Sequence, residues 1–166
     1  MRTFLPLALA GLVMAAPALA DETRIELPVP FSTTAIIADN IKSECSIGTT
    51  LAQALQAKAG AHGQRVVVGA AGADSGAGRS LQLEIVEAQS AGNAFSGHFK
   101  STAVRGVLFE DGRQVASVTA RRVSRGGAFA GFKGSCQVLD RTVNRIGDDL
   151  AQWLAAPADN ARLGDF

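Results

Sequence analysis

The chain contains 166 residues, with 16 lysines and arginines against 15 aspartates and glutamates, two cysteines and one tryptophan. This length suits a single domain that buries a core without several disulfides or a structural metal. Hydrophobic residues make up 47% of the chain, which excludes a disordered protein, and 18 glycines indicate many loops. The near-neutral charge argues against a general nucleic-acid binder, because phosphate binding requires a clear basic excess.

The first twenty residues have the pattern of a secretory signal peptide. Arg2 supplies a positive start, an apolar run follows, and Ala18-Leu19-Ala20 forms a small-residue cleavage site. The alternative is an uncleaved membrane anchor, although the run is shorter than the ~20 apolar residues that a spanning helix needs. We therefore predict export to the periplasm, cleavage after Ala20 and no transmembrane segment in the mature chain.

The two cysteines, Cys45 and Cys136, are predicted to form a disulfide, since an even number of cysteines in an exported chain favours pairing. The alternative is two separate buried thiols. A redox-active pair is disfavoured because the C-x-x-C spacing is absent. A metal site is disfavoured because His62 and His98 are the only further soft ligands, and no cofactor is predicted.

The N-terminal half of the mature chain predicts an edge strand followed by a helix. Thr23 to Val29 alternates weakly and ends at prolines, as edge strands do. From Ser43 to Ala59 the apolar residues recur at helical spacing, and Gly60 offers a stop. Two short strands are predicted next, residues 65–68 and 81–85, with the glycine-rich loop Gly69 to Gly78 between them.

The clearest local signal is a β-hairpin. Residues 99–110 and 113–123 are strand-like runs joined by Asp111-Gly112, the dipeptide favoured in a two-residue type I′ turn. If the two strands pair without a bulge after this turn, three pairs of residues lie opposite each other: Glu110 and Arg113, Leu108 and Val115, and Val104 and Thr119.

A second helix is predicted from Ser135, which is placed to cap it, to Pro157, which ends it. Arg145 is placed to pair with Asp149 one turn later. The apolar positions of this helix form one stripe: Leu139, Val143, Ile146, Leu150 and Trp153.

These elements predict one α+β domain over residues 23–155. We expect an antiparallel sheet of four to five strands with two helices packed on one face and one disulfide. Residues 156–166 are predicted to form a loose C-terminal tail.

The sequence predicts no catalytic residues, and the chain is expected not to be an enzyme. Residues 73–80 approach a phosphate-binding loop, but the lysine of that loop is replaced by Arg79 and a strand follows instead of a helix. Ser75 and His62 are too close in sequence for the arrangement of a chymotrypsin-like protease. His62 and His98 lie beside glycines, where single histidines are more often surface residues than bases.

One segment, residues 124–136, combines the features of a binding surface. It contains several glycines, two phenylalanines and two basic residues, and it leads into a helix N-terminus, which favours anions. From Arg113 to Arg145 seven basic residues stand against one acid, so the neutral total conceals a basic region. The structural alternative is that the phenylalanines close the end of the core while the glycines let the chain turn. The predicted binding residues are Arg121, Arg122, Arg125, Phe129, Phe132 and Lys133.

The order of elements resembles that of small α+β proteins of the Gram-negative envelope. The resemblance rests on the exported start, the helix before the sheet, the hairpin at Asp111-Gly112 and the glycine-rich approach to an amphipathic last helix. Uncharacterised periplasmic families and the accessory domains of lipid- or curli-export lipoproteins are similar in layout. Position 21 is Asp here and not the cysteine of a lipoprotein, and the resemblance assigns no functional residue.

We therefore expect a non-enzymatic periplasmic interaction or accessory protein. It would engage an envelope protein or an anionic envelope component through the basic, Gly/Phe-rich face. A second hypothesis is a secreted inhibitor of a host or competitor enzyme that uses the loop Gly69 to Gly78 as its plug.

Overall fold

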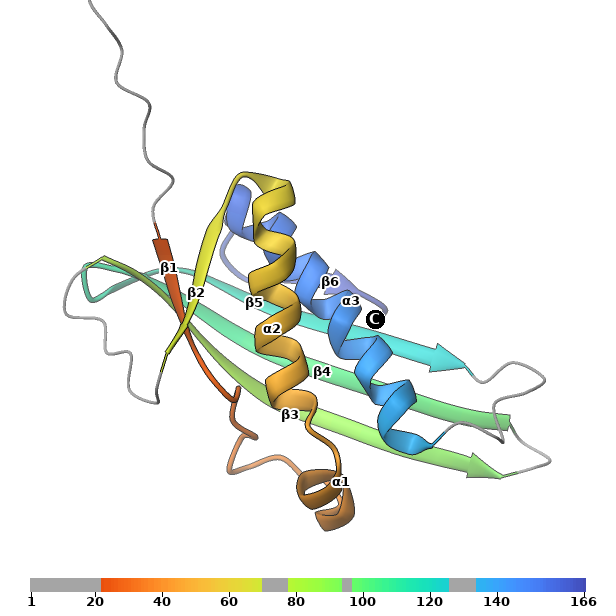
Figure 1. The fold of residues 1–166 in the computed structure, drawn as a ribbon. Helices are drawn as coiled ribbons and strands as arrows, with labels where there is room; N and C mark the ends of the chain where they lie inside the picture. Colours follow the sequence, from red (N-terminus) through yellow and green to blue (C-terminus); the bar gives the residue numbers. More distant parts are fainter. Residues whose placement is uncertain (1–21, 70–77, 94–96, 126–133) are drawn as a thin grey trace, which may run out of the picture.

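The computed structural model describes residues 22–69, 78–93, 97–125 and 134–166. In this part of the chain, six strands form one sheet in the order β2-β1-β3-β4-β5-β6 (Figure 1). The strands are β1 (Glu22–Glu26), β2 (Arg65–Gly69), β3 (Arg79–Asn93), β4 (Gly97–Glu110), β5 (Arg113–Arg125) and β6 (Ala161–Gly164). The helices are α1 (Asp39–Glu44), α2 (Ile47–Ala59) and α3 (Ser135–Ala155), with one 3₁₀ turn, η1 (Gly60–His62), after α2. Helices α2 and α3 lie side by side on one face of the sheet.

The sheet is mixed, so the prediction of an antiparallel sheet of four to five strands is wrong. Strand β1 is parallel to both β2 and β3, β3 to β5 form an antiparallel meander, and β5 is parallel to β6. Parallel neighbours require a crossover connection, which α2 supplies between β1 and β2 and α3 supplies between β5 and β6. The described fold therefore has three helices, not two, and parallel strands at both edges of the sheet.

The C-terminal residues are part of the sheet, so the prediction of a loose tail over residues 156–166 is wrong for β6. The backbone N–H of Asp165 donates to the carbonyl of Arg121 at 2.8 Å, and its carboxylate accepts from the N–H of Val123 at 2.9 Å. Ala161 and Leu163 pack against the core. A strand of four residues is too short for its alternation to stand out in the sequence.

The first predicted helix is divided. Helix α1 ends before Cys45, whose backbone is extended, and α2 begins at Ile47. The start of α2 lies against the backbone of Val29, where a Cβ on Gly48 would lie 2.3 Å from the carbonyl oxygen. The second predicted helix is present as α3, but Gly134 and not Ser135 occupies its N-cap position.

The hairpin turn is confirmed, whereas the register beyond it is not. Asp111 and Gly112 both have positive φ, 48° and 77°, as a type I′ turn requires, and Glu110 lies opposite Arg113. Strand β5 then has one extra, unpaired residue, Val115. The observed pairs are therefore Leu108 with Ala116 and Val104 with Ala120. A β-bulge of this kind moves every later side chain to the other face of the strand. It thereby turns three small or branched residues of β5 toward the helices: Ala116, Val118 and Ala120.

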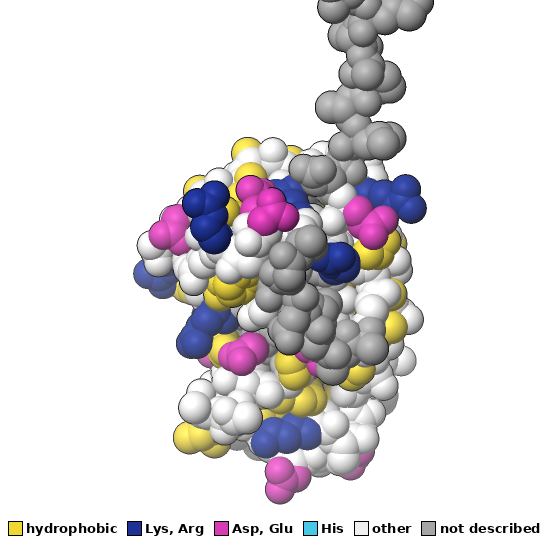
Figure 2. Space-filling model, turned by 90° about the vertical axis from the view of Figure 1, so that its left-hand side faces the viewer, with side chains coloured by type: hydrophobic (Ala, Val, Ile, Leu, Met, Phe, Trp, Pro, Cys, Tyr) yellow, Lys and Arg dark blue, Asp and Glu magenta, His cyan; other side chains and the backbone are white. Residues whose placement is uncertain are grey.

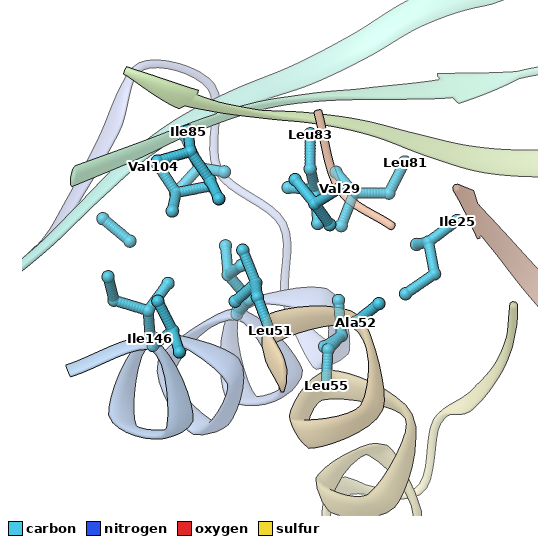
Figure 3. Packing of buried hydrophobic residues seen from close by; sticks show 14 of the residues in the cluster. Ile25, Val29, Leu51, Ala52, Leu55, Leu81, Leu83, Ile85, Val104 and Ile146 are labelled. Carbon is cyan, nitrogen blue, oxygen red and sulfur yellow. The ribbon is translucent and has the colours of Figure 1, made fainter. Parts of the chain in front are cut away.

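The core lies between the helices and the sheet (Figure 3). The predicted stripe of α3 is buried along its whole length. It packs with Leu51 and Leu55 of α2 against apolar residues of the central strands, including Leu83, Ile85 and Val104. Burial of such side chains contributes about 1.5–3 kcal/mol each, which makes this layer the main source of stability.

Candidate functional site

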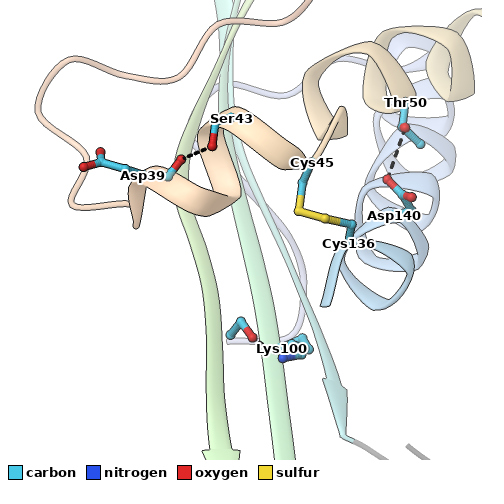
Figure 4. Close-up of a disulfide and its surroundings, with 8 residues drawn as sticks. Asp39, Ser43, Cys45, Thr50, Lys100, Cys136 and Asp140 are labelled. Carbon is cyan, nitrogen blue, oxygen red and sulfur yellow. Dashed lines mark hydrogen bonds between the residues drawn. A yellow bond between two sulfur atoms is a disulfide. The ribbon is translucent and has the colours of Figure 1, made fainter. Parts of the chain in front are cut away.

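The disulfide between Cys45 and Cys136 is confirmed and joins two helical segments that are distant in sequence (Figure 4). Cys45 lies at the junction of α1 and α2, and Cys136 lies in the first turn of α3. The Cα atoms are 5.1 Å apart, although the two cysteines are separated by 91 positions in the sequence. The cross-link therefore fixes the junction of α1 and α2 to the start of α3, at one end of the helical layer.

A cleft of about 650 Å³ opens at this end of the molecule. Its walls come from α1 with the residues just before it, from the later part of β3 and from the start of α3. The apolar part of the lining consists of Ile36, Ala38, Ile41, Ala88 and the disulfide. Ile36, at the rim of the cleft, is 100% exposed.

A buried lysine lies beside this cleft. Lys100 on β4 is only 6% exposed, and its ammonium group donates a hydrogen bond to the hydroxyl of Ser90, which lines the cleft (Figure 4). A charged group so far from water requires hydrogen-bond partners, because unpaired burial is costly. The cleft thus has a partly apolar lining, and the Lys100 ammonium lies next to it, bound to the lining residue Ser90.

Two of the predicted binding residues, Arg121 and Arg122, are neighbours on β5 and point to opposite faces of the sheet. The guanidinium of Arg122 binds the carboxylate of Asp149 on α3, and this hydrogen bond is the main cause that raises the pKa of Arg122. Arg121 lies 3.4 Å from the carboxylate of Glu87 and donates to the carbonyl of Asp165 at 3.2 Å. Both cations are therefore paired within the fold.

The other four predicted binding residues are not placed by the structure. The backbone of Arg125 ends β5, but its side chain lies outside the described part, as do Phe129, Phe132 and Lys133. Gly134, which follows Lys133 directly, lines the cleft. The chain that carries the predicted Gly/Phe face therefore rejoins the described structure at the cleft wall.

Charge on the face shown in Figure 2 does not gather into a basic patch. Basic and acidic side chains alternate there over the described residues. Two arginines of the basic region are paired across elements, Arg121 with Glu87 and Arg122 with Asp149. The basic excess counted along the sequence is thus partly neutralised in space.

The residues that resembled catalytic motifs in the sequence have structural contacts in the fold, where the structure describes them. Arg79 donates to the side chain of Gln64 at 3.0 Å and to the carbonyl of Leu154 at 3.1 Å, so it fastens β3 to neighbouring elements. His62 lies 3.6 Å from the carboxylate of Asp148 on α3. Ser75 and the side chain of His98 lie outside the described residues, as do residues 70–77 of the loop Gly69 to Gly78.

The described residues contain no group of three or more histidines, cysteines or acids that could hold a metal ion. Among the described helices, none is both long and apolar enough to cross a bilayer.

Sequence reasoning missed the cleft because its walls come from three segments that only folding brings together. The one signal available was the cysteine pair, which predicted contact between the first helix and the last. The exposure of Ile36 has no counterpart in the sequence, where it is one apolar residue of an aperiodic run.

Neither a protein-family model nor a curated protein matches this chain. Solved structures match in fold. A protein of Xanthomonas campestris assigned to the family model DUF330 is 13% identical, with a TM-score of 0.56 over 88% of this chain and 91% of that chain. A minor lipoprotein of Acinetobacter baumannii is 9% identical, with a TM-score of 0.52 over 84% and 95%. A hypothetical protein of Chlamydia trachomatis is 12% identical, with a TM-score of 0.52 over 82% and 99%; these identities show a shared fold alone.

Proposed function

We propose that this chain is an exported, non-enzymatic accessory protein of the bacterial envelope that holds a partner at the cleft between α1, β3 and α3. The observation that carries the proposal is the cleft of about 650 Å³, which is lined by apolar and polar side chains and has the fully exposed Ile36 at its rim. Removing such surface from water favours association. The partner would be an envelope protein or an anionic envelope component with an apolar segment that enters the cleft.

The placement in the envelope is supported by two independent features. The first twenty residues have the composition of a signal peptide. The Cys45–Cys136 disulfide suits an oxidising compartment such as the periplasm. A fold shared with a protein described as a minor lipoprotein agrees with this setting.

The basic, Gly/Phe-rich segment is proposed to take part in binding as well. It carries Arg125 and Lys133, and its residue Gly134 belongs to the cleft wall. A partner seated in the cleft would thus meet both an apolar surface and basic groups, which suits a ligand with an apolar part and negative charge.

Binding is favoured over catalysis by the chemistry of the cleft. Its polar lining includes three side-chain amides, one carboxylate and the Ser90 hydroxyl: Asn40, Gln89, Gln137, Glu44 and Ser90. The Lys100 ammonium donates a hydrogen bond to the Ser90 hydroxyl at the wall of the cleft. Such a lining provides orientation and specificity for a bound partner.

Site-specific photo-cross-linking in the native envelope tests the cleft. A photoreactive residue at position 36 is expected to capture a discrete partner, because this side chain is exposed at the rim. The control position is Arg141, which is exposed on α3 and does not line the cleft. Equal capture from both positions, or none from position 36, would contradict the proposed surface.

Charge reversal tests the Gly/Phe segment separately. Arg125→Glu with Lys133→Glu is expected to abolish partner capture while the thermal melt stays unchanged. The matched control reverses two exposed arginines on α3, Arg141→Glu with Arg145→Glu, and should retain capture. Normal capture by the first variant would remove the basic segment from the proposed function and leave the cleft to be judged by cross-linking.

A further inference from the structure

A second hollow, of about 370 Å³, lies on the opposite face of the sheet at its β6 edge. Arg105 on β4, Thr119 on β5 and Arg162 on β6 form one row across three neighbouring strands, because Thr119 is the register partner of both arginines. The neighbouring residues of the row, Val104 and Leu163, belong to the core side of the sheet, so the row itself faces away from the helices. We call this hollow the arginine notch.

The two arginines differ from the other cations of the sheet in their surroundings. Arg121 and Arg122 each lie within 4.0 Å of a carboxylate, whereas the ion pairs of the described residues include neither Arg105 nor Arg162. The Arg162 guanidinium instead lies over the Phe166 ring, 4.2 Å from its centroid. This cation–π contact orients a guanidinium while leaving its N–H donors available.

The row has the dimensions for one shared oxyanion. Adjacent strands are about 4.8 Å apart, so side chains on β4 and β6 start roughly 10 Å from each other. Two extended arginine side chains are long enough to reach a common point over that distance, and Thr119, the register partner of both arginines, lies between them in the row and offers a hydroxyl as a third donor. Planar guanidinium groups bind carboxylate and phosphate oxygens in bidentate pairs, and a phosphate group has enough oxygens to accept hydrogen bonds from two guanidinium groups at once.

Two acids border the notch. Glu84 is the register partner of Arg105 on β3, and Asp159 is bound by the hydroxyl of Ser117 and the side-chain amide of Asn160. Because Ser117 and Asn160 line the notch, their bonds to Asp159 hold that carboxylate in place at its border. These two carboxylates reduce the positive potential of the notch, so binding of an anion there depends on direct hydrogen bonds to the two guanidinium groups.

We propose that the arginine notch binds a phosphate group, held by Arg105 and Arg162 with the Thr119 hydroxyl between them. The notch is separate from the cleft beside the disulfide, so it gives the protein a second contact on the opposite face of the sheet. The phosphate could belong to a soluble phosphate ester or to a lipid headgroup, which present the same oxygens to the two guanidinium groups.

Titration of the folded, isotope-labelled protein with inorganic phosphate tests the site by NMR. Saturable shifts are expected at the backbone amides of Arg105, Thr119 and Arg162. The double variant Arg105→Gln with Arg162→Gln is expected to bind at least about tenfold more weakly, because charge-assisted hydrogen bonds are lost. The matched control replaces two exposed arginines outside the notch, Arg113→Gln with Arg145→Gln, and should bind as the parent does.

The source of the phosphate is distinguished by sedimentation with vesicles of phosphatidylglycerol, with phosphatidylcholine vesicles as the zwitterionic control. Binding to inorganic phosphate alone indicates a soluble ester, whereas notch-dependent binding to phosphatidylglycerol indicates a lipid headgroup. Shifts that do not saturate, or equal weakening in both double variants, would overturn the site. Because both arginines are exposed, unchanged melting of each variant verifies that the fold is intact.

Discussion

Arg122 on β5 binds the carboxylate of Asp149 on α3 through two hydrogen bonds, from Nε to Oδ2 at 2.7 Å and from Nη2 to Oδ1 at 2.6 Å. The side chains are only 25% and 17% exposed, and Asp165 approaches the same guanidinium at 3.5 Å. This bidentate pair joins the last long helix to the sheet and, through Asp165, to the C-terminal residues. Asp149 is thus bound by Arg122, although the helical spacing had predicted Arg145 as its partner.

Replacing Asp149 by asparagine is expected to lower the free energy of unfolding by about 1–2 kcal/mol, because a partly buried guanidinium loses a charged, bidentate partner. Urea denaturation measures the change. The matched control is Asp148→Asn, whose side chain is 53% exposed and makes only longer contacts to Lys58 and His62. That variant should stay within about 0.5 kcal/mol of the parent, and equal losses in both variants would refute the special role of the pair.

Removing the disulfide with Cys45→Ala and Cys136→Ala is expected to cost about 4–5 kcal/mol of stability. The reason is that the cross-link closes a loop of 91 residues and so restricts the unfolded chain. Denaturation of the oxidised parent, the reduced parent and the double variant measures the effect. The reduced parent should resemble the double variant, and a parent insensitive to reductant would contradict the prediction.

Gly147 is expected to be a site where one added methyl group destabilises the helical layer. A Cβ there would lie 2.8 Å from the Cβ of Ala54 and 2.9 Å from the backbone nitrogen of Leu55. Because the backbone of α2 would have to shift to make room for the methyl group, Gly147→Ala should lower the free energy of unfolding by about 1–3 kcal/mol.

The matched control for this substitution is Gly60→Ala. Gly60 has helical backbone angles and open space around its Cβ direction, so alanine should be neutral or stabilising by up to about 1 kcal/mol. Thermal or urea unfolding of the two variants measures the contrast. A stabilising Gly147→Ala would show that α2 and α3 do not approach each other as closely as described.

Asp159 is expected to titrate below the ordinary range of aspartate. The hydroxyl of Ser117 donates to its carboxylate at 2.6 Å and is the main cause that lowers the pKa of Asp159. A lowered folded-state pKa means that the contribution to stability is present above the ordinary aspartate pKa and is lost as the pH falls through the folded value.

Carboxyl-detected NMR titration of the parent and of Ser117→Ala measures this pKa directly. Removal of the hydroxyl should raise the pKa of Asp159 toward the ordinary value. An identical pKa in both proteins would show that the hydrogen bond from Ser117 does not favour the ionised carboxylate.

Features governed by local chemistry were predictable from the sequence. The Asp111-Gly112 turn follows from the positive φ angles of a type I′ turn, which this dipeptide tolerates. The buried stripe of α3 follows from helical spacing, and the pairing of Cys45 with Cys136 follows from their number in an exported chain. Each depends on residues that are adjacent, regularly spaced or without another partner.

Features governed by distant contacts were not predictable in the same way. The bulge at Val115 leaves no mark in composition, yet it decides which face of β5 meets the helices. Strand β6 is too short to be recognised from its sequence pattern. It pairs with β5 only because α3 returns the chain to the edge of the sheet. The cleft likewise exists only in the folded chain, where α1, β3 and the start of α3 lie close together.

By itself, the sequence determined the signal-like start, the hairpin turn, the two main helical segments and the cysteine pair, because these depend on short-range geometry and residue chemistry. Tertiary structure decided the mixed topology of the sheet and which charged side chains form ion pairs. Arg121 and Arg122 count as basic residues along the chain, but folding sets them beside Glu87 and Asp149, which are 34 and 27 positions away. Electrostatic energy depends on separation in space, so only the folded chain distinguishes arginines that form ion pairs from those, such as Arg105 and Arg162, that are exposed to solvent.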